Sequence, residues 1–68
     1  MSYRLKEDVA KDIKKKFRGV YLANTLGRTQ AYMSLLLNQK ISCPKTTAYA
    51  FTKMIDSDLE IDDLFERV

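Results

Sequence analysis

Apolar residues recur at helical spacing in two neighbouring stretches near the middle of the chain. Two sets each fall on one face of a helix with 3.6 residues per turn: Leu22, Ala23 and Leu26, then Met33, Leu36 and Leu37. Between the two stretches, Gly27 can adopt the left-handed conformation that ends a helix. Thr29 can then cap the next helix by accepting a backbone N–H. The pattern predicts two short helices joined by a tight turn, a helix-turn-helix.

The outward face of the second predicted helix is free of charge. It carries Gln30, Ala31, Ser34, Leu35 and Asn38, whose spacing makes one continuous stripe. In a DNA major groove, amides can bond adenine, a hydroxyl can donate or accept, and small apolar groups can contact a thymine methyl. The alternative is an ordinary solvated face on a helical core. Two outward hydrophobes and the absence of a carboxylate favour DNA.

The remaining apolar positions predict three further helices. Leu5, Val9, Ile13 and Phe17 recur every four residues and predict a first helix from about Tyr3 to Lys16, with Ser2 as its N-cap. A proline-started helix, with Pro44 in its first turn, runs to about Ile55, and a short final helix starts near Ile61. We therefore expect residues 1–68 to form one all-α domain, a compact bundle of five helices.

Composition narrows the classes of function. A chain of 68 residues with a single cysteine and no histidine has no internal disulfide and too few soft ligands for zinc. We expect no bound metal or cofactor, and we expect no functional role for Cys43. The sequence also shows no converging carboxylates and no glycine-rich phosphate loop, so we expect no enzyme. The lack of a long apolar run or a signal peptide predicts a soluble, cytoplasmic protein.

Charge is distributed unevenly along the chain. Residues 1–55 hold eleven Lys or Arg against three acids, a balance of +8, and residues 56–68 hold one Arg against six acids, a balance of −5. A basic body with an acidic end suits a polyanion bound on one face. The basic run over residues 14–18 could instead lie on a membrane surface, but its one aromatic residue fits the apolar stripe of the first helix.

The chain resembles the lambda-repressor-like helix-turn-helix family, and most of all its short phage Cro-like repressors. The resemblance is carried by the order of elements and by Leu22, Ala23, Leu26, Gly27, Arg28, Thr29, Met33, Ser34, Leu36, Leu37, Asn38, Gln39 and Lys40. It implies a five-helix domain that binds double-stranded operator DNA as a homodimer and takes part in a phage developmental switch. Repression would work by blocking access to a promoter.

The resemblance and the residue pattern together give three sets of candidate residues. Those for reading bases are Thr29, Gln30, Ala31, Ser34 and Leu35. Those for contacting phosphates are Lys16, Arg18, Arg28, Tyr32, Asn38, Lys40 and Lys45. Those for a dimer interface are Leu59, Ile61, Leu64, Phe65 and Val68, although Leu64 and Phe65 could equally close the core.

The sequence also departs from the family pattern. Gly19 stands where a phosphate-clamping glutamine is common, Arg28 replaces an apolar turn residue, and Gln39 replaces a common glycine. The connection from Ile55 to Leu64 is about two residues longer than is typical of the family. An alternative function stays open, a helix-turn-helix module that binds and modulates another repressor protein.

Overall fold

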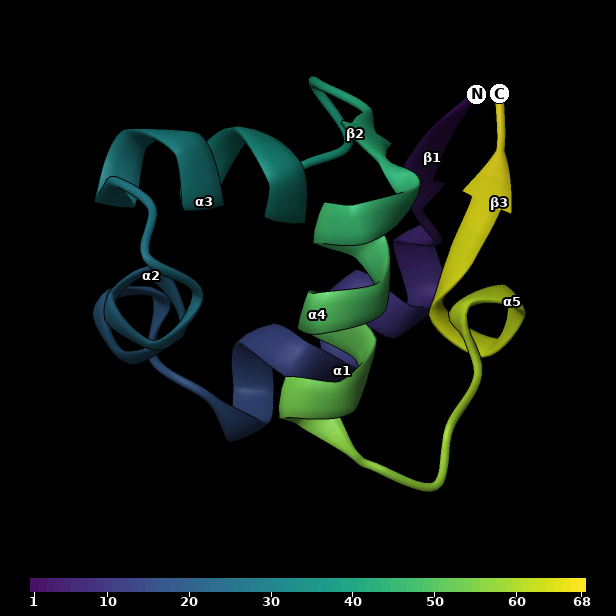
Figure 1. The fold of residues 1–68 in the computed structure, drawn as a ribbon. Coiled ribbons are helices and arrows are strands. Elements are labelled where there is room, and N and C mark those ends of the chain that lie inside the picture. Colours follow the sequence, from purple (N-terminus) through teal and green to yellow (C-terminus); the bar gives the residue numbers. More distant parts are fainter.

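Helices and short strands alternate along the chain in the computed structural model, which describes all residues from 1 to 68 (Figure 1). The strands are β1 (Ser2–Leu5), β2 (Cys43–Pro44) and β3 (Phe65–Arg67). The helices are α1 (Glu7–Lys16), α2 (Gly19–Leu26), α3 (Gln30–Leu37), α4 (Lys45–Ile55) and α5 (Ile61–Leu64). None of these helices is both long and apolar enough to cross a lipid bilayer.

The three strands form one antiparallel sheet in the order β2-β1-β3, so the all-α prediction is wrong. The sheet joins both ends of the chain, which lie side by side in Figure 1. Arg4 pairs with Glu66 across β1 and β3, and the backbone N–H of Val68 donates to the carbonyl of Ser2 at 2.9 Å. The fold is a mixed one, in which five helices pack with a small sheet made from the two chain ends and the segment before α4.

The first predicted helix begins too early in the sequence. Tyr3 and Leu5 are buried on either side of exposed Arg4, which is the two-residue alternation of a strand. Leu5 also fits a four-residue helical repeat, and this double fit produced the error. Helix α1 starts only at Glu7, so Ser2 lies in β1 and caps nothing.

The second half of the chain follows the prediction more closely. Helix α4 ends at Ile55 as expected, but Pro44 precedes it as the N-cap and belongs to β2. Helix α5 begins at Ile61 as expected and is only four residues long, because the backbone becomes extended at Phe65 and continues as β3. The segment that the sequence assigned to one short helix is therefore a helical turn followed by an edge strand.

A single apolar core lies between the sheet and the helices. Phe51 of α4 and Phe65 of β3 are both fully buried, and their rings meet edge to face with centroids 5.6 Å apart. Leu5 of β1 and Leu22 of α2 are buried in the same cluster, and so is Leu36 of α3. The core therefore holds the helix-turn-helix against both α4 and the sheet.

Candidate nucleic-acid interface

The turn between α2 and α3 has the two caps that the sequence predicts. Gly27 lies at φ 75°, in the left-handed region, and its N–H bonds the carbonyls of Ala23 and Asn24. Thr29 has an extended backbone, and its Oγ1 accepts the N–H of Tyr32 at 3.0 Å. A helix stop and a helix start two residues apart fix the angle between α2 and α3. Both cap predictions are confirmed.

The two faces of α3 are as different as the apolar pattern predicts. Its inward residues Met33, Leu36 and Leu37 are buried, and small Ala23 of α2 is buried against them. The outward stripe is solvent-exposed along its whole length, at Gln30, Ala31, Ser34, Leu35 and Asn38. Leu35 has 44% of its surface exposed, so the core leaves nearly half of this large apolar side chain in contact with water.

The C-terminal end of α3 is tied to α1 through Asn38. Its Nδ2 donates to the carbonyl of Ser34 at 2.8 Å, and its Oδ1 accepts a hydrogen bond from Nζ of Lys14. Lys40 lies two residues further along the chain and is exposed. Lys14 was not among the predicted phosphate contacts, because the sequence of α1 does not show which of its lysines meets α3.

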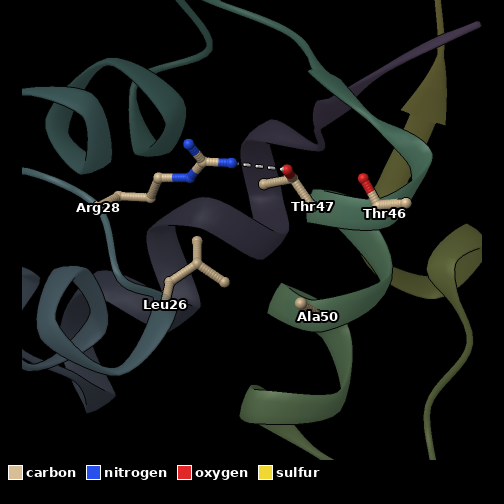
Figure 2. A pocket seen from close by; sticks show the side chains of 5 residues that line it. All are labelled: Leu26, Arg28, Thr46, Thr47 and Ala50. Atoms are coloured by element: carbon tan, nitrogen blue, oxygen red, sulfur yellow. Dashed lines mark hydrogen bonds between the residues drawn. The ribbon is translucent and has the colours of Figure 1, made fainter.

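The N-terminal end of α3 carries a second cationic group, Arg28. Figure 2 shows its guanidinium reaching from the turn to α4, where a terminal nitrogen donates to Oγ1 of buried Thr47 at 3.3 Å. The same guanidinium lies 5.2 Å from the ring centroid of Tyr32, within cation–π range. It borders a cavity of about 240 Å³ lined by Leu26, Arg28, Thr46, Thr47 and Ala50. Arg28 therefore braces the turn against α4 while remaining exposed.

The other predicted phosphate contacts are spread more widely. Arg18 is exposed and occupies the N-cap of α2, and Lys16 forms an exposed ion pair with Asp12 at 3.1 Å. Lys45 lines a different cavity, together with Tyr3, Tyr49, Glu60, Ile61 and Asp62. It thus lies beside acidic side chains, on the flank of α4 that faces α5, and not with Arg28. The structure does not bring Lys45 together with the α3 stripe.

Helix α3 and its neighbours α2 and α4 are free of acidic side chains. No Asp or Glu occurs between Asp12 and Asp56, so α2, α3 and α4 carry none. The three ion pairs in the molecule involve Arg4, Lys11 and Lys16, and leave the charges of Lys14 and Lys40 uncompensated by a carboxylate. Asp62 and Asp63 of α5 and Glu66 of β3 lie on elements that Figure 1 shows on the side away from α2 and α3, whereas Asp56 borders a cavity with Asp12 and Lys16 at the end of α1.

Two titratable groups near the turn have raised pKa values. Burial raises the pKa of Tyr32, with a smaller contribution from nearby Cys43, while the charge of Arg28 acts in the opposite direction. Burial also raises the pKa of Cys43, again against the charge of Arg28. Cys43 therefore has a cationic neighbour that the sequence did not reveal. The Tyr32 phenol stays protonated at neutral pH and can donate a hydrogen bond to a phosphate.

The residues predicted for a dimer interface divide into two groups. Leu64 and Phe65 are only 5% and 1% exposed, so their side chains face the core of their own subunit. Leu59 and Ile61 are half-buried against that core, and Val68 is exposed at the end of the sheet. Only the second group leaves apolar surface for a second copy of the chain.

Comparisons of the chain with protein-family models, with curated proteins and with solved structures find no match. The α3 stripe and the cationic groups at its two ends are therefore the features that bear on function.

Proposed function

We propose that this chain is a sequence-specific double-stranded DNA-binding transcriptional regulator of the Cro-like kind. Helix α3 enters the major groove of an operator, and the bound protein blocks access to a promoter. One observation carries the proposal: the exposed stripe of α3 is uncharged along its length and has a cation at each end, Arg28 before it and Lys40 after it. This is the arrangement that a helix needs to read bases between two phosphate backbones.

The size of α3 fits the groove. An α-helix with its side chains is about 10–12 Å across, and the major groove of B-DNA is about 12 Å wide, so α3 can lie in it with its exposed stripe toward the bases. Gln30 stands at the first helical position and is exposed, and its side chain makes no hydrogen bond inside the protein. Its amide is therefore free to form the bidentate contact that glutamine makes with adenine. The caps at Gly27 and Thr29 hold the helix in a fixed direction during that contact.

Phosphate contacts are proposed for both ends of the helix. Lys14 and Lys40 serve the C-terminal end, and Arg28, with the protonated phenol of Tyr32, serves the N-terminal end. Arg18 supplies a further cation at the start of α2, where the positive end of the helix dipole also favours a phosphate. No carboxylate on α2, α3 or α4 opposes the approach of a duplex to these cations.

A homodimer on a near-palindromic site completes the proposal. Half-sites of such operators lie about one helical turn apart, roughly 34 Å. The chain measures 25 × 24 × 21 Å, so two copies side by side can hold their α3 helices at that separation. The apolar surface that half-buried Leu59 and Ile61 and exposed Val68 leave to solvent is the proposed contact between them.

The test is a titration of two duplexes, one of random sequence and one taken from the DNA that flanks the gene of this chain, each at two salt concentrations. Neutralising four phosphates per subunit, by Lys14, Arg18, Arg28 and Lys40, predicts a log–log salt slope of about −4 per bound subunit. Tight, salt-sensitive binding to the flanking DNA above the random background supports the proposal. Failure to bind either duplex at low salt contradicts it.

A second candidate function is favoured by the outer face of α2. Tyr21 is 53% exposed and Val20 is 39% exposed, and the Tyr21 ring stacks on Phe17 with centroids 6.3 Å apart. Such a patch suits a protein partner, for example another repressor that this chain modulates. Association with a protein would lack the steep negative salt slope of phosphate contacts, so the same titration separates the two functions.

A further inference from the structure

We infer that α3 recognises A·T base pairs, with Gln30 bound to adenine and with Ala31 and Leu35 in contact with the 5-methyl group of thymine. The inference rests on the proposed function and adds to it the class of DNA sequence that the stripe fits. Three features of the stripe carry it: the state of its amides, the position of its apolar groups, and the charges that it lacks.

The two amides of the stripe differ in availability. Asn38 is occupied inside the protein, because its Oδ1 accepts from Lys14 and its Nδ2 donates to the Ser34 carbonyl at 2.8 Å. That Nδ2 also lies 3.5 Å from Oγ of Ser34. Gln30 has no partner inside the protein, so it is the amide left for a base. A free carboxamide matches the N7 acceptor and N6 donor of adenine.

The apolar groups of the stripe form a pair one helical turn apart. Ala31 and Leu35 are spaced i and i+4, so their side chains lie next to each other on the helix surface, and both are exposed. Leu35 is the one large apolar residue of α3 that the core leaves 44% exposed. Among the edges of the bases in the major groove, the apolar group is the 5-methyl of thymine. Burial of Leu35 against that methyl removes apolar surface from water on both partners.

The stripe also lacks the groups that recognise G·C pairs most strongly. Guanine is read most often by Arg or Lys, and the N4 donor of cytosine by Asp or Glu, and the stripe contains none of these four residue types. The nearest Arg is Arg28, which is held at the turn by Thr47 and stacks over the Tyr32 ring. The available amide and the apolar pair therefore both favour A·T.

The experiment is a selection from a library of random-sequence duplexes, followed by replacement of each thymine of the selected duplex with deoxyuridine, which lacks the 5-methyl group. We expect a core of A·T pairs in which at least one such replacement weakens binding about fourfold, the effect of burying one methyl-sized group. In Leu35→Ala, the same replacement should have little further effect. Tyr49→Ala is the control, because Tyr49 is also exposed and apolar but belongs to α4, and it should keep the full loss.

The outcomes separate this inference from the proposed function. A selected core of G·C pairs, or a selected duplex in which no deoxyuridine replacement changes affinity, overturns the reading of thymine while leaving sequence-specific binding intact. Failure to select any sequence, with no binding to the unselected library at low salt, overturns the proposed function and this inference with it. Circular dichroism of Leu35→Ala checks that the variant is folded, as expected for a change at an exposed position.

Discussion

Lys14 of α1 and Asn38 at the end of α3 are joined by a hydrogen bond, in which Nζ of Lys14 donates to Oδ1 of Asn38. The contact joins residues 24 positions apart and connects the C-terminal ends of two helices. Because the Asn38 amide also bonds the Ser34 carbonyl, it links Lys14 to the last turn of α3. The same contact therefore steadies α3 and brings a cation to its end.

Substituting this lysine tests whether it contacts phosphate. Lys14→Met should lower affinity for specific and random duplexes by similar factors and make the log–log salt slope shallower by about 0.9, the contribution of one phosphate. Its free energy of unfolding should change by less than about 0.5 kcal/mol, because the side chain is exposed. Binding isotherms at several salt concentrations give the slope, and urea unfolding gives the stability.

Arg67→Met is the matched control for Lys14→Met. Arg67 is also an exposed cation, but it lies on β3, where its one side-chain hydrogen bond is to the sulfur of Met1. Its loss should leave the salt slope unchanged. An equal change of slope in both variants would mean that the net charge of the protein, and not the position of Lys14, governs binding.

Gln30→Ala is expected to act on specificity. The variant should weaken binding to the selected duplex by about 1–3 kcal/mol and leave binding to random duplex nearly unchanged, because one bidentate base contact is lost and no phosphate contact is. Lys40→Ala is the comparison, since it should weaken binding to both duplexes and flatten the salt slope by about one unit. Equal losses on both duplexes for Gln30→Ala would reject its role in reading a base.

The helix-turn-helix could be predicted from the sequence because its signals are local. Gly27 and Thr29 determine a stop and a start within three residues, and the apolar spacing of α3 assigns its inward and outward faces. The hydrogen bond from Lys14 to Asn38 could not be predicted in this way. It depends on how α1 packs beside α3, and nothing within either helix encodes that contact.

The three-stranded sheet could not be predicted from the sequence for a related reason. Strands β1 and β3 pair residues at least sixty positions apart, so neither strand is recognisable from its own neighbours in sequence. Leu5 satisfies both the helical repeat of the following residues and the alternation with Tyr3, and Phe65 continues the apolar pattern of α5. Each strand has only three or four residues, too few for alternation to outweigh a helical pattern.

Two residues with positive φ should respond to substitution with opposite signs. Gly27 lies at φ 75° and Gln39 at φ 57°, a region that costs a residue with a Cβ about 1–2 kcal/mol. Gly27→Ala should therefore destabilise the fold by about 1 kcal/mol, after a partial gain from a less flexible unfolded chain. Gln39→Gly should stabilise it by about 0.5 kcal/mol, since relief of strain exceeds the loss of the bond from Gln39 Nε2 to the Leu37 carbonyl. Urea unfolding measures both.

Gly19→Ala is the control for the backbone argument. Gly19 and Gly27 both have open space where a Cβ would be placed, but Gly19 begins α2 without a positive φ. Alanine should therefore stabilise at position 19, by about 0.5 kcal/mol, and destabilise at position 27. Destabilisation of similar size at both glycines would show that conformation at Gly27 is not the cause.

The free energy of unfolding should fall as the solution becomes alkaline, in part through Cys43. Burial raises the pKa of this thiol above its ordinary value of 9.0, although the charge of Arg28 opposes the shift. The unfolded chain therefore loses the thiol proton at a lower pH than the folded chain, so stability is complete below about pH 9 and falls as the pH rises through the folded pKa. Tyr32, whose pKa is raised from 10.0, adds a loss of stability of the same sign at higher pH.

Urea unfolding of wild type and of Cys43→Ala across this pH range measures the contribution of the thiol. The free energy of unfolding should fall less steeply for Cys43→Ala between about pH 9 and 10, whereas Tyr32→Phe should keep the part of the fall that comes from the thiol. Identical curves for wild type and Cys43→Ala would show that the thiol titrates alike in the folded and unfolded chains.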